Sequence, residues 1–164
     1  MVAKKNIQTI IDISTKYNAQ QREVIGQNIV ERIRERTNRG VNKDGSRFPS
    51  YNPEYAKEKG SRRVNLSATD DMLTELDIVT TSPGKITIGY PVDHEDAGRV
   101  EGNQIGSYGQ PNANPSKARP FIGITQKEKD LIIAKSEQEF GDSDEDNSSL
   151  ISSFINSIIR NQGK

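Results

Sequence analysis

Residues 76–90, LDIVTTSPGKITIGY, decide the predicted fold class of this chain. The segments LDIVTT and KITIGY are rich in apolar and β-branched residues, and the turn residues Ser-Pro-Gly at 82–84 separate them. Two such segments around a short turn are typical of a β-hairpin. In the second segment Ile86 and Ile88 alternate with polar residues, as expected for an antiparallel sheet with one solvated face.

Residues 18–40 predict the main helix. Asn18 is a favoured residue at a helix start and Gly40 is a favoured residue at a helix end. Apolar residues recur along one stripe between these positions: Val24, Ile25, Ile29 and Ile33. The polar side carries arginines toward its C-terminal end, where the helix dipole favours positive charge. They are Arg32, Arg34, Arg36 and Arg39.

A second long helix is predicted over 126–139. Thr125 and Glu128 have the spacing of a capping box, and an apolar Leu-Ile-Ile segment follows at 131–133. Together with the hairpin, this pattern predicts an α+β fold. We expect an antiparallel sheet of several short strands, with the helices over 18–40 and 126–139 packed on one face, and helical terminal extensions.

A single domain is expected over 18–140 of the 164-residue chain. Residues 1–17 predict a separate N-terminal arm, because Ile7, Ile10 and Ile11 have helical spacing. Residues 91–116 are rich in glycine and proline and predict a long loop that becomes ordered on contact with neighbours.

The composition predicts a small hydrophobic core. Ile, Leu, Val and Phe together make up about 22% of the chain, close to the composition at which chains stop folding. Part of the chain is therefore expected to be disordered or to bury its apolar residues against a partner. No apolar stretch is long enough for a membrane span, and the N-terminal residues lack the pattern of a secretory signal.

Formal net charge is zero, but the charges are unevenly distributed along the sequence. Residues 1–63 carry fourteen Lys and Arg against seven Asp and Glu, whereas residues 64–164 carry nine against sixteen. Such a split suggests a partner for each half, or subunits that meet basic face to acidic face. Nucleic acid is an open alternative for the basic half.

No catalytic residue, metal site or cofactor site is predicted. The chain has no cysteine and a single histidine, His94, which excludes thiol catalysis and a multi-histidine metal site within one subunit. The run His-Glu-Asp at 94–96 is interpreted as a solvated loop, because neighbouring loop residues diverge whereas metal ligands converge. The sequence lacks a phosphate-binding glycine motif and a nucleophile elbow.

The last residues predict a docking helix behind a linker. Residues 141–149 are polar and acidic, and they lack the central glycine and final glutamate of a calcium loop; we therefore interpret them as a linker. Residues 150–164 begin with an amphipathic stripe, which is interpreted either as part of the subunit's own core or as a helix that docks on a partner. The second interpretation is preferred because of the linker.

An ordered set of segments resembles the tail-completion and virion-morphogenesis proteins of tailed bacteriophages. The segments are DGSRFPSYNPEYAKEKG, LSATDDMLTELDIVT, KITIGYP, AGRVEG and ARPFIGITQKEKDLI, and the resemblance covers about residues 25–137. In that family a DG-x-x-F…Y…YA-x-x-K segment comes first and ARPF-[LI]-G-[LI] opens the final helix. This chain has Thr-Asp-Asp at 69–71 where the family usually has Thr-Gly, and only residues 99–102 correspond to its His-Gln-Gly.

The resemblance implies a structural virion protein without enzyme activity, cofactor or metal. Such a protein forms a ring, here expected to be a hexamer or dodecamer, in the phage neck. There it joins the portal or connector side to tail-tube or terminator proteins, with DNA only as lumen contents and no membrane contact. The expected location is the virion, and the host cytoplasm during assembly. The first alternative is a nucleic-acid-binding accessory protein that uses the arginine-rich helix, and the second is a small enzyme.

Two sets of residues follow from these interpretations. The expected subunit or partner interface consists of Arg32, Arg36, Arg39, Arg62, Arg63, Ile151, Phe154, Ile155, Ile158 and Ile159. The residues expected to form the structural motif are Phe48, Tyr51, Tyr55, Arg119, Pro120 and Phe121.

Overall fold

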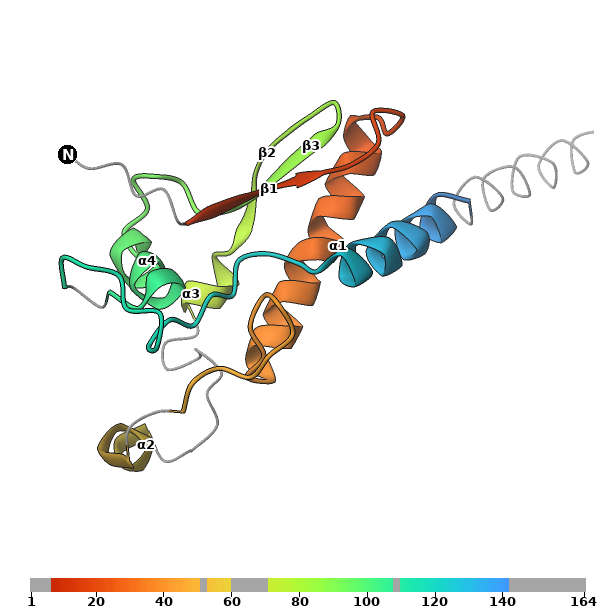
Figure 1. The fold of residues 1–164 in the computed structure, drawn as a ribbon. Coiled ribbons are helices and arrows are strands. Elements are labelled where there is room, and N and C mark those ends of the chain that lie inside the picture. The colour runs from red at the N-terminus through yellow and green to blue at the C-terminus, as the bar shows by residue number, and fades with distance from the viewer. Residues whose placement is uncertain (1–6, 51–52, 60–70, 108–109, 142–164) are drawn as a thin grey trace, which may run out of the picture.

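The computed structural model describes residues 7–50, 53–59, 71–107 and 110–141 (Figure 1). Its labelled elements are β1 (Gln8–Asp12), α1 (Ala19–Asn38), α2 (Pro53–Lys59), α3 (Asp71–Thr74), β2 (Asp77–Ser82), β3 (Lys85–Gly89) and α4 (Ala97–Ile105). A further helix covers 126–141. A three-stranded antiparallel sheet with these helices confirms the predicted α+β class.

The hairpin predicted from residues 76–90 is present as β2 and β3. The two strands pair antiparallel around Pro83 and Gly84, with Ser82 opposite Lys85. Gly84 has a φ of 81°, a left-handed conformation that glycine adopts without the steric cost of a side chain. The same strand β3 also pairs with β1, so that the strand order is β1-β3-β2.

Helix α1 packs against one face of this sheet (Figure 1). Its start is fixed by a capping box, because Asn18 Oδ1 accepts from the Gln21 N–H at 2.8 Å and Gln21 Oε1 accepts from the Asn18 N–H at 3.0 Å. Ile25, Ile29 and Ile33 are buried on its inner face. The predicted stripe is therefore the core-facing side of α1.

The expected N-terminal helical arm is wrong, because its residues form strand β1 and part of the sheet. Ile7 and Ile11 are buried, whereas Ile10 is 60% exposed. That alternation follows the two-residue period of a strand, and pairing with β3 satisfies the backbone hydrogen bonds of the segment. The boundary expected between 17 and 18 thus falls inside one hydrophobic core.

The long loop expected over 91–116 contains helix α4. Ala97 and Val100 face the core, and Gly106 ends the helix in the left-handed conformation with a φ of 76°. Gly98 and Gly102 leave two positions of this helix without a side chain, so the helical periodicity of apolar residues is weak in the sequence. The polar segment 110–120 after it is irregular, as expected.

The helix predicted over 126–139 is observed over 126–141. It lies beside α1, where Asn28 Nδ2 donates to Ser136 Oγ at 3.0 Å and Ile132 is buried. Residues 142–164, which include most of the expected linker and the expected docking helix, lie outside the described residues. Among the helices that the structure describes, none has the length and apolar character needed to cross a membrane.

Candidate functional site

A buried ion pair joins α1 to the 126–141 helix. Arg36 is 2% exposed, and its Nη1 lies 2.8 Å from Glu128 Oε1. Its Nη2 donates to the carbonyl oxygens of Phe121 and Gly123, both at 2.8 Å. One guanidinium therefore joins α1, the extended ARPF segment and the helix that follows it.

Glu128 receives a second arginine and also caps its own helix. Its Oε2 lies 2.7 Å from Arg32 Nε, its Oε1 accepts from the Thr125 N–H at 3.1 Å, and its own N–H donates to Thr125 Oγ1 at 3.1 Å. Burial alone raises the pKa of Glu128, but the Thr125 N–H and the two guanidinium groups outweigh it, so the pKa lies below its usual range. The carboxylate is thus held ionised.

Two of the three α1 arginines expected at an interface, Arg32 and Arg36, are instead paired with Glu128 within the chain. Besides Arg32 and Arg36, Arg34 donates to the carbonyl oxygens of Leu73, Thr74 and Leu76. The end of α3 and the extended 121–123 segment present carbonyl groups that need donors, and α1 supplies them. Arg39 is exposed. Arg62, Arg63 and the apolar residues of 150–160 lie outside the described residues.

Of the residues expected to form the structural motif, Phe121 contacts this ion pair through its carbonyl oxygen. Phe121 is fully buried and Phe48 is 6% exposed, while the Pro120 carbonyl accepts from the Lys43 N–H at 2.9 Å. Arg119 Nε donates to the Pro49 carbonyl at 3.3 Å, which ties the returning chain to the 39–50 segment. Tyr51 and the side chain of Tyr55 lie outside the described residues.

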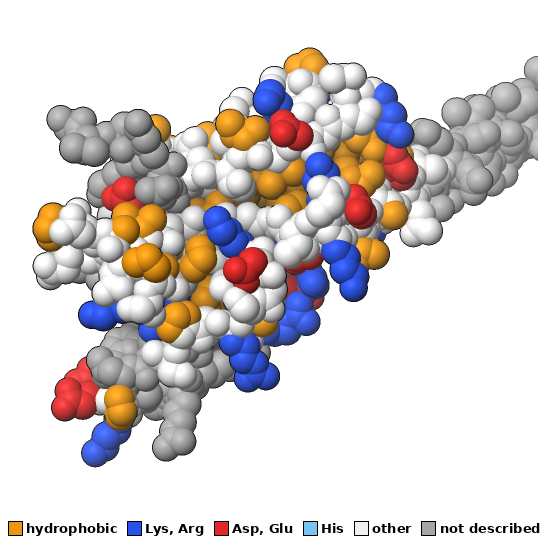
Figure 2. Space-filling model, in the orientation of Figure 1, with side chains coloured by type: hydrophobic (Ala, Val, Ile, Leu, Met, Phe, Trp, Pro, Cys, Tyr) orange, Lys and Arg blue, Asp and Glu red, His pale blue; other side chains and the backbone are white. Residues whose placement is uncertain are grey.

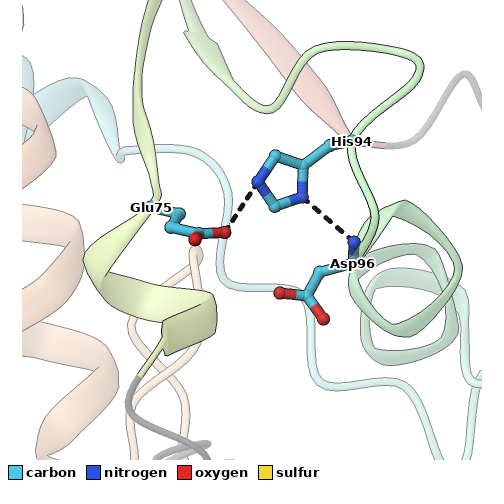
Figure 3. Close-up of side chains that lie close together, drawn as sticks. All are labelled: Glu75, His94 and Asp96. Atoms are coloured by element: carbon cyan, nitrogen blue, oxygen red, sulfur yellow. Dashed lines mark hydrogen bonds and ion pairs between the residues drawn. The ribbon is translucent and has the colours of Figure 1, made fainter.

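A cluster of Glu75, His94 and Asp96 lies where α3, β3 and α4 converge (Figure 3). His94 Nε2 is 2.7 Å from Glu75 Oε2, and His94 Nδ1 accepts from the Asp96 N–H at 3.1 Å. The side chain of His94 is 17% exposed, which corrects the expectation of a solvated residue. Sequence reasoning missed Glu75 because it is nineteen positions away and no local pattern connects the two.

The potential ligand atoms of this cluster lie within 4.8 Å of one another, but both nitrogens of His94 are engaged in hydrogen bonds. A metal needs an unprotonated ring nitrogen with a free lone pair, whereas Nδ1 accepts from a backbone N–H and Nε2 faces the Glu75 carboxylate. In addition, Asp96 Oδ1 is 2.8 Å from Arg99 Nη2. The arrangement therefore fits a set of polar contacts that holds the ends of α3, β3 and α4 together better than it fits a metal site.

A groove of about 570 Å³ lies between the turn after β1 and the 126–141 helix. We call it the Ile133 groove; its apolar lining is Ile13, Tyr17, Ile133 and Ala134. At its end Tyr17 Oη donates to Glu137 Oε1 at 2.5 Å, and Lys16 Nζ lies 2.9 Å from the same oxygen. Figure 2 shows hydrophobic side chains in the hollow between these two segments.

The charged rim of the Ile133 groove contains more acidic than basic residues. It includes Asp12, Asp130 and Glu137 against Lys129, whose Nζ donates to the Asp12 carbonyl at 2.7 Å. Two of these carboxylates are paired, Asp12 with Lys85 at 3.3 Å and Glu137 with Lys16 at 2.9 Å, so the rim carries little net charge. An apolar groove of this kind suits a peptide or helix better than a small polar ligand. Comparison of the chain with known protein families, with curated protein sequences and with solved structures found no match in any of the three.

Proposed function

We propose that this chain is a structural virion protein of a tailed bacteriophage, which forms a homo-oligomeric ring in the neck and joins the portal or connector side to the tail tube. The proposal starts from the resemblance carried by the ordered segments between residues 25 and 137. In the fold, Phe48 from the first of these segments and Phe121 from the last are buried in one core, and Arg119 connects them. The first and last of these segments therefore contribute to one core through Phe48 and Phe121, which is compatible with a scaffold role.

The open sheet is the observation that most strongly supports the association of subunits in a ring. α1 packs on the face that holds Ile86 and Ile88, which are fully buried, whereas Ile10 on the other face is 60% exposed. Within the described residues no strand pairs with the outer edge of β1 or β2. Unpaired edge strands and an uncovered face are surfaces on which another chain can add, and a repeated subunit in a closed ring offers the complementary surface.

The internal arginine contacts make the nucleic-acid alternative less attractive. That alternative uses the arginine face of α1, but Arg34 and Arg36 are engaged with backbone carbonyls and Glu128. Cations committed to internal partners contribute little to phosphate binding, which depends on free Lys and Arg. A strong, salt-sensitive shift of DNA by the purified chain would nevertheless favour it over the ring.

Native mass and negative-stain images of the purified chain test the proposed function. The expected result is a ring of six or twelve copies, formed either by the chain alone or after purified neck proteins are added. Particles that bind to isolated heads or tails only when this chain is supplied would support the head–tail joining role. A chain that stays monomeric at high concentration, even with portal and tail proteins present, would exclude it.

A further inference from the structure

The Ile133 groove leaves apolar surface uncovered on the long helix of the described structure. Ile13 and Ile133 are only partly buried against the core, and Ala134 is exposed. The groove runs along the flank of the 126–141 helix that faces away from α1, while Ile132 occupies the inner side. An apolar trough of this kind, open along a helix, has the shape that accepts a second amphipathic helix.

The chain contains a segment that matches this trough in polarity. Residues 150–159 have apolar side chains at six of ten positions, spaced along one helical stripe. The segment 150–164 has no acidic residue and carries Arg160 and Lys164. Of the rim carboxylates, Asp12 and Glu137 are paired with Lys85 and Lys16, which leaves Asp130 for this positive end to meet.

The acidic residues between the 126–141 helix and this segment make it unfavourable for the segment to fold back onto the groove of its own subunit. Six of the ten residues from 137 to 146 are Asp or Glu, and none is Lys or Arg. Acidic groups at a helix C-terminus meet the negative end of the helix dipole, and linkers of like charge repel themselves and extend. The helix runs to residue 141, so eight residues, 142–149, connect it to this segment and can span up to about 28 Å when extended, which is enough to reach an adjacent subunit.

We propose that the Ile133 groove is the receptor for residues 150–160 of a second copy of this chain, so that each subunit reaches onto the next. The inference rests on the proposed ring and adds the contact that links its subunits. The interface is heterologous, because groove and segment are different surfaces of the same chain, and a heterologous contact can close into a ring.

The absence of cysteine in the sequence makes disulfide trapping a clean test. One chain carries Ala134→Cys in the groove, and a second chain with a different tag carries Ile155→Cys. Val92→Cys is the matched control, because Val92 is also apolar and exposed, at 58%, but is not among the groove residues. After mixing and mild oxidation, the groove pair is expected to cross-link at least about tenfold faster than the control pair, since docking raises the effective concentration of the two thiols.

Two results would overturn the proposal. One is a groove pair that cross-links no faster than the Val92 control. The other is an Ala134→Cys/Ile155→Cys double variant that forms only an intramolecular disulfide, at a rate that does not change on dilution, because this would place the segment on its own subunit.

Ring formation is scored separately, so that the inference and the proposed function can fail independently. Ala134→Glu, at an exposed helix position, is expected to retain the fold and to abolish the ring, whereas Val92→Glu preserves both. Rings that persist in Ala134→Glu would refute the groove as the subunit contact and leave the proposed function standing. Ala134→Cys and Ile155→Cys chains that cross-link through the groove as pairs, while the wild-type chain never forms rings, would support the contact and refute the ring.

Discussion

At the scale of single residues, Glu128 holds the fold together by serving two purposes with one carboxylate. It caps the 126–141 helix at Thr125 and it neutralises the buried Arg36. Removing one partner of a buried ion pair leaves the other charge without compensation, a change that typically destabilises a protein by about 3–5 kcal/mol. We therefore regard this carboxylate as a main determinant of the acid sensitivity of the domain.

The pKa of Glu128 lies below its usual value in the folded state, so the folded protein binds this proton less readily than the unfolded chain. The resulting stability is fully present above the unfolded pKa, near 4.5, and is lost as the pH falls through the folded pKa. In urea unfolding between pH 6 and pH 3, wild type and Glu128→Gln should differ strongly in their free energy of unfolding at pH 6. The gap should narrow steadily toward acid pH.

Glu35→Gln is the matched control for this experiment. Glu35 is exposed, and its carboxylate forms a loose surface ion pair with Arg32 at 3.8 Å. The variant should unfold like the wild type throughout the pH range, as expected for an exposed ion pair. A gap for Glu128→Gln that stays constant with pH would show that the carboxylate stabilises the fold through packing rather than through its charge.

Phe121 provides a second prediction at the same scale. Its ring is fully buried, and truncation of a buried phenylalanine typically costs about 3–5 kcal/mol in the free energy of unfolding. In a small core we expect Phe121→Ala to lower the melting temperature sharply or to prevent folding. Phe121→Leu keeps most of the volume and should fold with a smaller loss. An unchanged melting temperature in Phe121→Ala would contradict the assignment of this segment to the core.

At the scale of elements, the close approach of α1 to β2 explains a glycine inside the main helix. A Cβ at Gly26 would lie 2.5 Å from Ile78 Cδ1 and 2.8 Å from Ile78 Cγ1. Gly26→Val should therefore destabilise the domain by about 1–3 kcal/mol through overpacking. Shortening the opposing side chain in Gly26→Val/Ile78→Ala should recover part of the loss, as measured by a double-mutant cycle in urea. Strictly additive effects would show that the two elements do not meet there.

Elements with strong local signals could be predicted from the sequence, and those defined by distant contacts could not. The hairpin has a turn and alternating residues, and α1 has the cap at Asn18, so both were correct in type and position. Strand β1 differs from the predicted helix because isoleucines at 7, 10 and 11 fit a helical stripe, and only the pairing with β3 separates the buried Ile7 and Ile11 from the exposed Ile10. The buried position of Arg36 was missed for a similar reason, since arginines are mostly exposed and its partner Glu128 is 92 residues away.

At the scale of the whole molecule, the terminal segment should be separable from the fold. The buried residues of the described core all lie between 7 and 132. A chain truncated after 141 should therefore unfold at nearly the same urea concentration as the full chain, yet fail to form rings. Loss of the fold would show that residues 142–164 complete the core of their own subunit. Normal rings would show that the segment is dispensable for assembly.

The uneven distribution of charge leads to the last prediction, which concerns how the assembly responds to salt. Residues 1–63 carry twice as many basic as acidic residues, and the remainder is acidic. Lys and Arg side chains also lie along the lower edge of the face in Figure 2. If such surfaces meet between subunits, salt screens them, since the screening length falls from about 8 Å at physiological ionic strength to about 3 Å at 1 M. Rings should dissociate in sedimentation velocity as NaCl is raised, while the urea midpoint of the subunit changes little because Arg36 and Glu128 are buried.

The apolar groove contact predicts the opposite response to sodium sulfate, which strengthens apolar burial. Rings that resist NaCl would assign the interface to apolar contacts alone and leave the charge split without a role in assembly.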